Sequence, residues 1–175
     1  MLTLLERARK TRLLVMDVDG VLTDGKIIQD RHGHEVKVFD VKDGHGIVMA
    51  HRAKLRTGLI SGRESETITR RAEELGIALV FQKVWNKLEV YEKILMDTAL
   101  THDEVAYVGD DVVDIPLLRR VGLAVAVADA VDEVKAVSHF ITQRPGGQGA
   151  VREVIELILR AQGHWDTLLE RYTKA

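Results

Sequence analysis

LLVMDVDGVLTDG, residues 13–25, is an apolar run that ends in closely spaced carboxylates. Residues 13–18 have the composition of a fully buried strand, and Asp17 and Asp19 stand at its end. Like charges held this close repel one another, and the pKa of one of them rises unless a cation neutralises the pair. The stretch therefore predicts a strand of the core that leads into a charged site.

Apolar runs alternate with helical patterns along the rest of the chain. Further strands are expected at residues 57–60, 78–81, 105–108, 123–127 and 139–142, and helices at 2–10, 46–54, 64–75, 87–99, 112–121, 131–137 and 150–162. Such alternation is typical of a parallel sheet with helices on both faces. The expected fold class is α/β, a doubly wound, Rossmann-like parallel sheet, in a single domain over residues 1–175.

Some segments leave this pattern. Residues 26–29 and 35–40 flank a polar turn that contains Gly33, which predicts a projecting β-hairpin at about 25–41. The spacing between the polar motifs leaves no room for an inserted cap domain. The glycine-rich run at 145–149 is expected to be a flexible turn, and residues 163–175 a loose tail.

The composition excludes several classes of function. The chain has 175 residues, 46% hydrophobic and 30% charged, with a net charge of -2 and no cysteine. A chain this close to neutral lacks the basic surface of a nucleic-acid-binding protein. Its longest apolar stretch, residues 121–128, is too short to span a bilayer. We expect a cytoplasmic protein with neither a nucleic-acid nor a membrane partner.

Polar residues follow four of the predicted strands at the point where each strand ends. In chain order they are Asp17 with Asp19, Ser61-Gly62-Arg63, Lys87, and Asp110-Asp111 with Asp114. The carboxyl ends of parallel strands share one edge of a sheet, where α/β proteins bind ligands. Each motif alone could be a turn, a helix cap or a solvated lysine. Their common placement favours a functional site.

The residue types indicate the chemistry. Several carboxylates facing one crevice suit Mg²⁺, which prefers oxygen ligands and bridges to phosphate, whereas the scattered histidines do not suggest a zinc site. One carboxylate can attack phosphorus and form an acyl phosphate. A second can protonate the leaving oxygen and then take a proton from water. Ser61, backbone N–H groups and Lys87 could hold the phosphoryl oxygens.

The strings DVDGVLT (17–23), ISGR (60–63), Lys87 and GDDVVD (109–114) resemble, in order, the four motifs of the haloacid dehalogenase-like phosphatases. Longer strings, among them VFDVKDGHGI and RPGGQGAVREV, resemble the branch of this family that acts on 3-deoxy-D-manno-octulosonate 8-phosphate (KDO 8-phosphate), a precursor for bacterial lipopolysaccharide. The resemblance covers residues 10–162. It implies Mg²⁺-dependent hydrolysis of a phosphorylated sugar acid through an aspartyl phosphate.

The resemblance also implies a role for each matching residue. Asp17 would be the nucleophile, and Asp19 the general acid and base. Magnesium would be held by Asp17, the backbone oxygen of Asp19 and Asp110, with Asp111 and Asp114 around them. Phosphate would be held by Ser61, Gly62 and Lys87. Contacts to the sugar acid would come from Asp19, Asp40, Val41, Lys42, Asp43, Gly44, Arg63 and Arg71.

Arg63 and Arg71 are the expected partners of the sugar-acid carboxylate, because a guanidinium binds a carboxylate in a bidentate fork. Eight residues separate them, about two helical turns, so they fall on nearly the same helix face. In a purely structural alternative they pair with surface glutamates, which stabilises the fold little.

Two departures leave the exact sugar acid open. Position 40 is Asp where many relatives have Asn, and position 48 is Val where many have a cation. A phosphatase for another keto-sugar acid is therefore an alternative. Two other classes are a receiver-like signalling domain, which needs an Asp at the end of its third strand, and a non-catalytic oligomerisation domain.

A site without a cap domain would lie open to water, which suits phosphoryl transfer poorly. The hairpin offers apolar edges that a neighbouring copy could cover. We therefore expect a homo-oligomer, and the resemblance implies a homotetramer.

Overall fold

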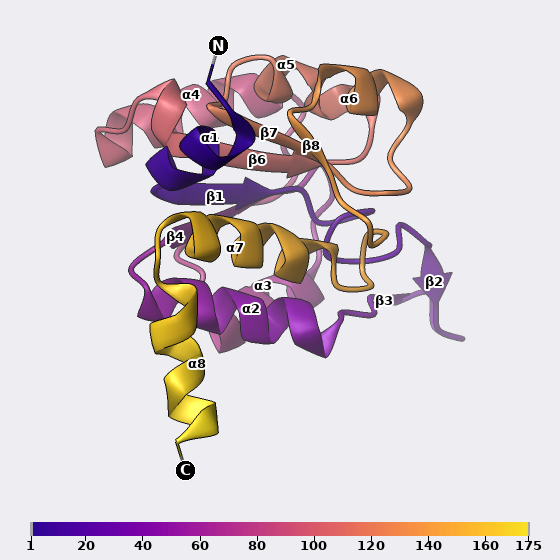
Figure 1. Ribbon diagram of the computed structural model, residues 1–175. Helices are drawn as coiled ribbons and strands as arrows, with labels where there is room; N and C mark the ends of the chain where they lie inside the picture. The colour runs from indigo at the N-terminus through magenta and orange to yellow at the C-terminus, as the bar shows by residue number, and fades with distance from the viewer. Residues whose placement is uncertain (1, 175) are drawn as a thin grey trace.

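The computed structural model describes residues 2–174, which form a six-stranded parallel sheet and a separate hairpin (Figure 1). The strand order is β5-β4-β1-β6-β7-β8, and every neighbouring pair in it is parallel. The strands are β1 (Leu13–Met16), β4 (Arg56–Ile60), β5 (Leu79–Phe81), β6 (Val105–Gly109), β7 (Leu123–Ala126) and β8 (Phe140–Ile141). This architecture confirms the expected fold class.

Helices cover the two faces of the sheet in separate groups (Figure 1). One group contains α2 (Val41–Arg52), α3 (Glu66–Leu75) and α7 (Ala150–Ala161), with α1 (Leu4–Lys10) packed against α7. The other contains α4 (Lys87–Thr98), α5 (Ile115–Leu118) and α6 (Asp132–Val137). Short 3₁₀ turns, η1 (His102–Glu104) and η2 (Val112–Asp114), precede β6 and α5. No helix within residues 2–174 has the length and apolar character that a membrane span requires.

The central strands β1 and β7 are buried along their whole length, which explains their continuous apolar sequences. Burial of these side chains is the main stabilising contribution, at roughly 25 cal/mol per Å² of apolar surface removed from water. The polar residues that follow the strands are therefore held at the edge of a rigid core.

Helix α2 begins five residues before the expected position at Gly46. Asp40 caps it, because its carboxylate accepts a hydrogen bond of 2.6 Å from the backbone N–H of Lys42. Capping and packing against α7 compensate for the glycines of its first turns. Helix α3 ends as expected at Gly76, which adopts a left-handed φ of 73°.

The hairpin is present and projects from the body of the molecule, as Figure 1 shows. It consists of β2 (Ile28–Gln29) and β3 (Glu35–Val36), which pair antiparallel. The segment after Gly163 differs from the loose tail that we expected, since it forms helix α8 (Trp165–Thr173). The Trp165 ring is buried, and the guanidinium carbon of Arg160 lies 4.5 Å from its centroid, which anchors the start of this helix.

Candidate active site

The motifs around Asp17, Lys87 and Asp110 lie together at the carboxyl edge of the sheet, and Ser61 stands at the end of the neighbouring strand β4. The backbone N–H of Asp17 donates a 3.0 Å hydrogen bond to the carbonyl of Val108, which extends the β1–β6 pairing by one residue. The N–H of Ser61 donates a 2.8 Å bond to the carbonyl of Phe81 and extends β4 in the same way. Both residues are therefore fixed by the sheet itself.

Lys87 connects the motifs through its ammonium group. Its Nζ lies 2.8 Å from Oδ2 of Asp17 and 2.7 Å from Oδ1 of Asp114, and its side chain is 5% exposed. Burial opposes the charged form, but the two carboxylates outweigh it and raise the pKa of Lys87. A fixed positive charge thus stands beside the first carboxylate of the sequence motif.

The three carboxylates around Lys87 carry more negative charge than this one ammonium group neutralises. Oxygens of Asp17, Asp110 and Asp114 lie within 4.8 Å of one another. Burial and the neighbouring carboxylates raise the pKa of Asp110 to about 8, and burial together with Asp114 raises that of Asp17 to about 6. Oδ1 of Asp110 is buried and has no hydrogen-bond partner among residues 2–174. A hard divalent cation would satisfy this oxygen and neutralise the cluster.

Asp114 has a different role from the other two carboxylates. Its Oδ1 accepts a 2.6 Å hydrogen bond from the Tyr107 hydroxyl in addition to the contact with Lys87. Its Oδ2 accepts from the backbone N–H groups of Asp110 at 3.0 Å and Asp111 at 3.4 Å. With both oxygens occupied, Asp114 orients Lys87 and the loop after β6. Each Asp114 oxygen has two donors, whereas each Asp17 oxygen accepts a single bond, from the backbone N–H of Val18 or from Lys87, and Oδ1 of Asp110 accepts none. Asp17 and Asp110 therefore retain lone pairs for a cation.

Asp111 belongs to this loop, and Tyr107 belongs to β6, the strand that precedes it. Asp111 is exposed, and its side chain caps η2 through the N–H of Val112 at 2.7 Å. Tyr107 was not among the expected site residues. Its signal was present in the sequence, because a tyrosine inside a buried strand needs a partner for its hydroxyl.

Asp19 is joined to the hairpin. Its carboxylate pairs with the ammonium of Lys37, which also lies 3.1 Å from Oε1 of Glu35. The same Glu35 oxygen contacts Nη2 of Arg63 at 3.1 Å. Sequence reasoning missed Lys37 and Glu35. The alternation in EVKVF could have revealed them, because residues 35, 37 and 39 share one face of an extended strand.

The residues expected around the sugar acid differ in their exposure to solvent and in their contacts. Asp40 caps α2, a role that Asn would fill equally well, so its departure from the family pattern has a structural explanation. Val41 and Lys42 are exposed. Asp43 is buried, and its carboxylate accepts hydrogen bonds from the N–H groups of Gly149 at 3.3 Å and Arg152 at 2.7 Å.

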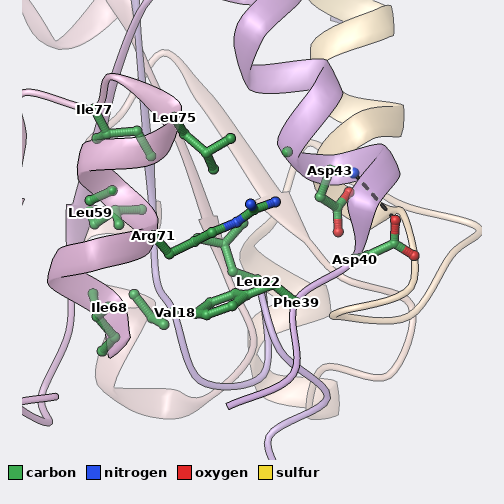
Figure 2. A pocket seen from close by; sticks show the side chains of 12 residues that line it. Val18, Leu22, Phe39, Asp40, Asp43, Leu59, Ile68, Arg71, Leu75 and Ile77 are labelled. Atoms are coloured by element: carbon green, nitrogen blue, oxygen red, sulfur yellow. Dashed lines mark hydrogen bonds between the residues drawn. The ribbon is translucent and has the colours of Figure 1, made fainter. Parts of the chain in front are cut away.

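Arg71 lies apart from the carboxylate cluster. Figure 2 shows its guanidinium extending from α3 toward the first turn of α2, into a cavity of about 10 Å³ lined largely by apolar side chains. It pairs with Glu74 at 2.7 Å and lies over the Phe39 ring at 5.9 Å. A Cβ atom at Gly44 would stand 2.2 Å from Nη2 of Arg71, so Gly44 makes room for this side chain. Val48 packs against the core on the same helix.

The glycine-rich run at 145–149 is packed against the loop that follows β1, which corrects the expectation of a flexible turn. The N–H of Gly147 donates a 2.9 Å bond to the carbonyl of Val21. A Cβ atom at Gly146 would stand 1.8 Å from the carbonyl oxygen of Gly20. Glycine is therefore required here by the close approach of two backbones.

The chain is similar to known proteins over most of its length. Residues 60–155 match the family model described as haloacid dehalogenase-like hydrolase. The chain is 43% identical over 160 residues to the 3-deoxy-D-manno-octulosonate 8-phosphate phosphatase of Escherichia coli K12, a match that covers 91% of this chain and 85% of the relative. The corresponding Yersinia pestis protein is 42% identical over 158 residues, covering 90% and 84%.

Solved structures give the same result. A probable phosphatase from Pseudomonas syringae pv. phaseolica superposes with a TM-score of 0.97 at 44% identity, covering 98% of both chains. The 3-deoxy-D-manno-octulosonate 8-phosphate phosphatase of Moraxella catarrhalis, solved with a magnesium ion, a phosphate ion and KDO, superposes with a TM-score of 0.95 at 37% identity, covering 97% of both chains.

Proposed function

The chain belongs to the haloacid dehalogenase-like hydrolases and, within them, to the family of 3-deoxy-D-manno-octulosonate 8-phosphate phosphatases, and from this premise we propose that it hydrolyses KDO 8-phosphate to KDO and phosphate. The observation that carries the proposal is the buried contact of Lys87 with Asp17, beside the unpartnered carboxylate oxygen of Asp110. The proposed nucleophile, the proposed phosphate-binding cation and the proposed metal ligand thus lie together.

In the proposed reaction, a carboxylate oxygen of Asp17 forms a bond to phosphorus while the bond from phosphorus to the sugar oxygen breaks. Asp19 gives its proton to that leaving oxygen. Water then attacks the acyl phosphate, Asp19 takes a proton from the water, and the Asp17–phosphorus bond breaks. Ser61, the Gly62 N–H and Lys87 hold the phosphoryl oxygens, where negative charge must be stabilised.

The donor set of this site suits Mg²⁺. Carboxylate oxygens of Asp17 and Asp110 would hold it, together with the backbone oxygen of Asp19, because each oxygen of Asp114 already accepts from two donors. When bound, the cation supplies positive charge that offsets the charge of the phosphate.

Arg63 is the first candidate for binding the carboxylate of the sugar acid. It follows the Ser61 loop directly, is linked to the hairpin through Glu35, and its side chain is 46% exposed. Lys42 at the start of α2 is a second exposed cation. Arg71, Asp40, Val41, Asp43 and Gly44 remain in the proposed set, and the burial of Asp43 and Gly44 favours an indirect contribution through the shape of α2.

The hairpin supports the proposal of a homotetramer. Ile27 and Val38 are 63% and 61% exposed, and Ile28 and Val36 add apolar surface next to them. Covering this surface with a neighbouring copy would remove it from water. The proposed location is the cytoplasm, because a multiply charged sugar phosphate does not cross a membrane unaided and must meet the enzyme where it is made.

The proposal is tested by measuring phosphate release from a panel of phosphorylated sugar acids. We expect KDO 8-phosphate to give the highest kcat/KM, chelator to stop the reaction and Mg²⁺ to restore it. Asp17→Asn should fold and show no turnover, since an amide cannot form the acyl phosphate. Asp24→Asn is the matched control, because Asp24 lies in the same loop and pairs with the exposed Lys26.

Turnover by Asp17→Asn at a rate near that of the wild type would rule out the mechanism. A clear preference for another sugar acid would leave the phosphatase chemistry intact and replace the substrate. Asp19→Asn should lose about 10²–10⁴-fold in rate, the usual contribution of general acid–base catalysis.

A further inference from the structure

Lys37 is a buried lysine that the proposed mechanism does not use. It lies just after the hairpin strand β3, and its side chain is 2% exposed. An ammonium group removed from water to this extent needs compensating partners, since burial of an unpaired charge is costly. Its partners are the carboxylates of Asp19 and Glu35. The hairpin thus places the ammonium group of Lys37 next to Asp19, the proposed general acid.

The contact with Asp19 is specific to one oxygen. Lys37 Nζ contacts Oδ1, and among residues 2–174 Lys37 is the sole side chain that is hydrogen-bonded to the Asp19 carboxylate. The side chain of Asp19 is 26% exposed, so its other oxygen has room to meet a substrate. A carboxyl group held by one oxygen presents the second in a defined direction.

We propose that Lys37 is a positioning residue for Asp19: it holds Oδ1 so that Oδ2 faces the oxygen of the leaving group. This inference rests on the proposed function, in which Asp19 protonates that oxygen. As the phosphorus–oxygen bond breaks, the proton moves from Asp19 to the leaving oxygen and Asp19 becomes a carboxylate. The ammonium of Lys37 stabilises the charge that develops there, in a position set before the reaction starts.

The remaining contacts explain how Lys37 is itself held. Glu35 lies two residues earlier on the same face of the strand and contacts both Lys37 and Arg63. The row Asp19, Lys37, Glu35, Arg63 alternates in charge, so each member attracts its neighbours. A purely structural alternative is that Lys37 serves only to anchor the hairpin. The two readings differ in what happens when the leaving group needs no proton.

The test compares kcat/KM for two aryl phosphates of similar size, phenyl phosphate and 4-nitrophenyl phosphate. This parameter covers the steps up to departure of the leaving group. Phenoxide requires protonation, whereas 4-nitrophenoxide leaves readily without it. Lys37→Met should therefore lower kcat/KM for phenyl phosphate at least about tenfold more than for 4-nitrophenyl phosphate, within the range of general acid catalysis. Lys37→Gln should shift the ratio in the same direction, and Lys37→Arg should restore part of it.

Lys26→Met is the matched control, since Lys26 precedes the same hairpin but is 74% exposed and pairs with Asp24. Glu35→Gln neutralises the other partner of Lys37 but keeps an oxygen acceptor for its ammonium group, so it should shift the ratio of the two substrates less than Lys37→Met does. Equal losses on both substrates in Lys37→Met and Lys37→Gln, or no loss on either, would overturn the proposal. Thermal melting identifies a variant that fails to fold, and Lys37→Arg, which keeps the charge, then decides the question.

Neither substrate carries a sugar or a carboxylate, so this result is independent of which sugar acid the enzyme prefers. Asp19→Asn serves as the reference. If Asp19→Asn does not change the ratio of the two substrates, the general acid of the proposed mechanism is wrong. If it does and the Lys37 variants do not, only the role of Lys37 is wrong.

Discussion

Asp43 is almost entirely removed from solvent, with two backbone N–H groups at the start of α7 as its hydrogen-bond donors. Burial is the largest influence on it, and despite these donors its pKa rises from 3.8 to about 6. The folded state therefore binds a proton more tightly than the unfolded state does. The stabilisation from this proton is fully present below pH 3.8 and is lost as the pH rises through about 6.

Asp43→Asn should remove this pH dependence while keeping an acceptor for the N–H groups. We expect the free energy of unfolding of the variant to increase relative to that of the wild type between pH 4.5 and 8, by at most ~3 kcal/mol for a shift of about two pKa units. Urea unfolding across this range measures the difference. Asp132→Asn is the control, because its side chain is 99% exposed. A constant difference for Asp43→Asn would contradict the prediction.

Arg63 is the residue at which substrate recognition can be separated from phosphate chemistry. Arg63→Ala should raise KM for KDO 8-phosphate roughly tenfold, a loss of about 1.4 kcal/mol, because a bidentate contact to the sugar-acid carboxylate is lost. Hydrolysis of 4-nitrophenyl phosphate, which has no carboxylate, should hardly change. Arg70→Ala is the control, since Arg70 pairs with Glu66 on the exposed side of α3. Equal losses on both substrates would assign Arg63 to the phosphate or to the fold.

The sequence predicted a common position for those proposed site residues that come after strands. Asp17, Ser61, Lys87 and Asp110 could be placed at one edge because a parallel sheet aligns the ends of its strands. Lys37 could not be found in the same way, since its contact with Asp19 depends on how the hairpin folds back over the edge. Strand ends are set by local pattern, whereas contacts between loops require the path of the chain.

At the scale of elements, the 145–149 segment acts as a support for the loop after β1. The N–H of Gly146 donates to Oδ1 of Asp129 at 2.8 Å, and its neighbour Gly147 has a φ of 65°. These bonds hold the segment against the carbonyl of Gly20, within the loop that carries Asp19. The loop that carries Asp19 is thus packed against a backbone segment from the far end of the chain.

Gly146→Ala should therefore displace the loop that carries Asp19. We expect kcat to fall at least tenfold and the melting temperature to drop, because overpacking of this kind costs about 1–3 kcal/mol. Gly33→Ala is the matched control: Gly33 has a φ of 81°, but a Cβ atom there meets nothing within 4 Å. It tests the conformational cost of losing glycine without a clash. Full activity in Gly146→Ala would show that the two loops move independently.

The sequence predicted the existence of almost every element but not all of their limits. The start of helix α2 was predicted too late in the sequence. Its glycines disfavour a helix, but the side chain of Asp40 caps the helix and fixes where it begins. Helix α8 was expected to be a loose tail. Burial of Trp165 against α7, with Arg152 and Arg160 near its ring, explains why this segment is ordered. A local cap in the first case and a tertiary contact in the second decide what intrinsic helix propensity leaves open.

At the scale of the whole molecule, exposed apolar side chains lie in the loops near the carboxylate cluster. Trp85, two residues before Lys87, is 96% exposed, and Val112 and Val113 after Asp110 are 50% and 58% exposed. The hairpin adds its own apolar residues beside Asp19. A single chain would expose this surface to water next to a site where phosphoryl transfer favours its exclusion.

Association through the hairpin would cover this surface, and the oligomeric state can be measured directly. Light scattering at micromolar concentration should give the mass of four chains for the wild type. Ile27→Asp combined with Val38→Asp should yield smaller species, because a carboxylate buried at an interface without a partner costs several kcal/mol. Met96→Asp is the matched control: Met96 is 76% exposed on α4, away from the hairpin, so its substitution should leave the mass unchanged.

If the Ile27→Asp, Val38→Asp double variant dissociates and at the same time loses activity on KDO 8-phosphate, the neighbouring chain completes the site. A wild type that is fully active as a monomer would show instead that one chain protects its own reaction.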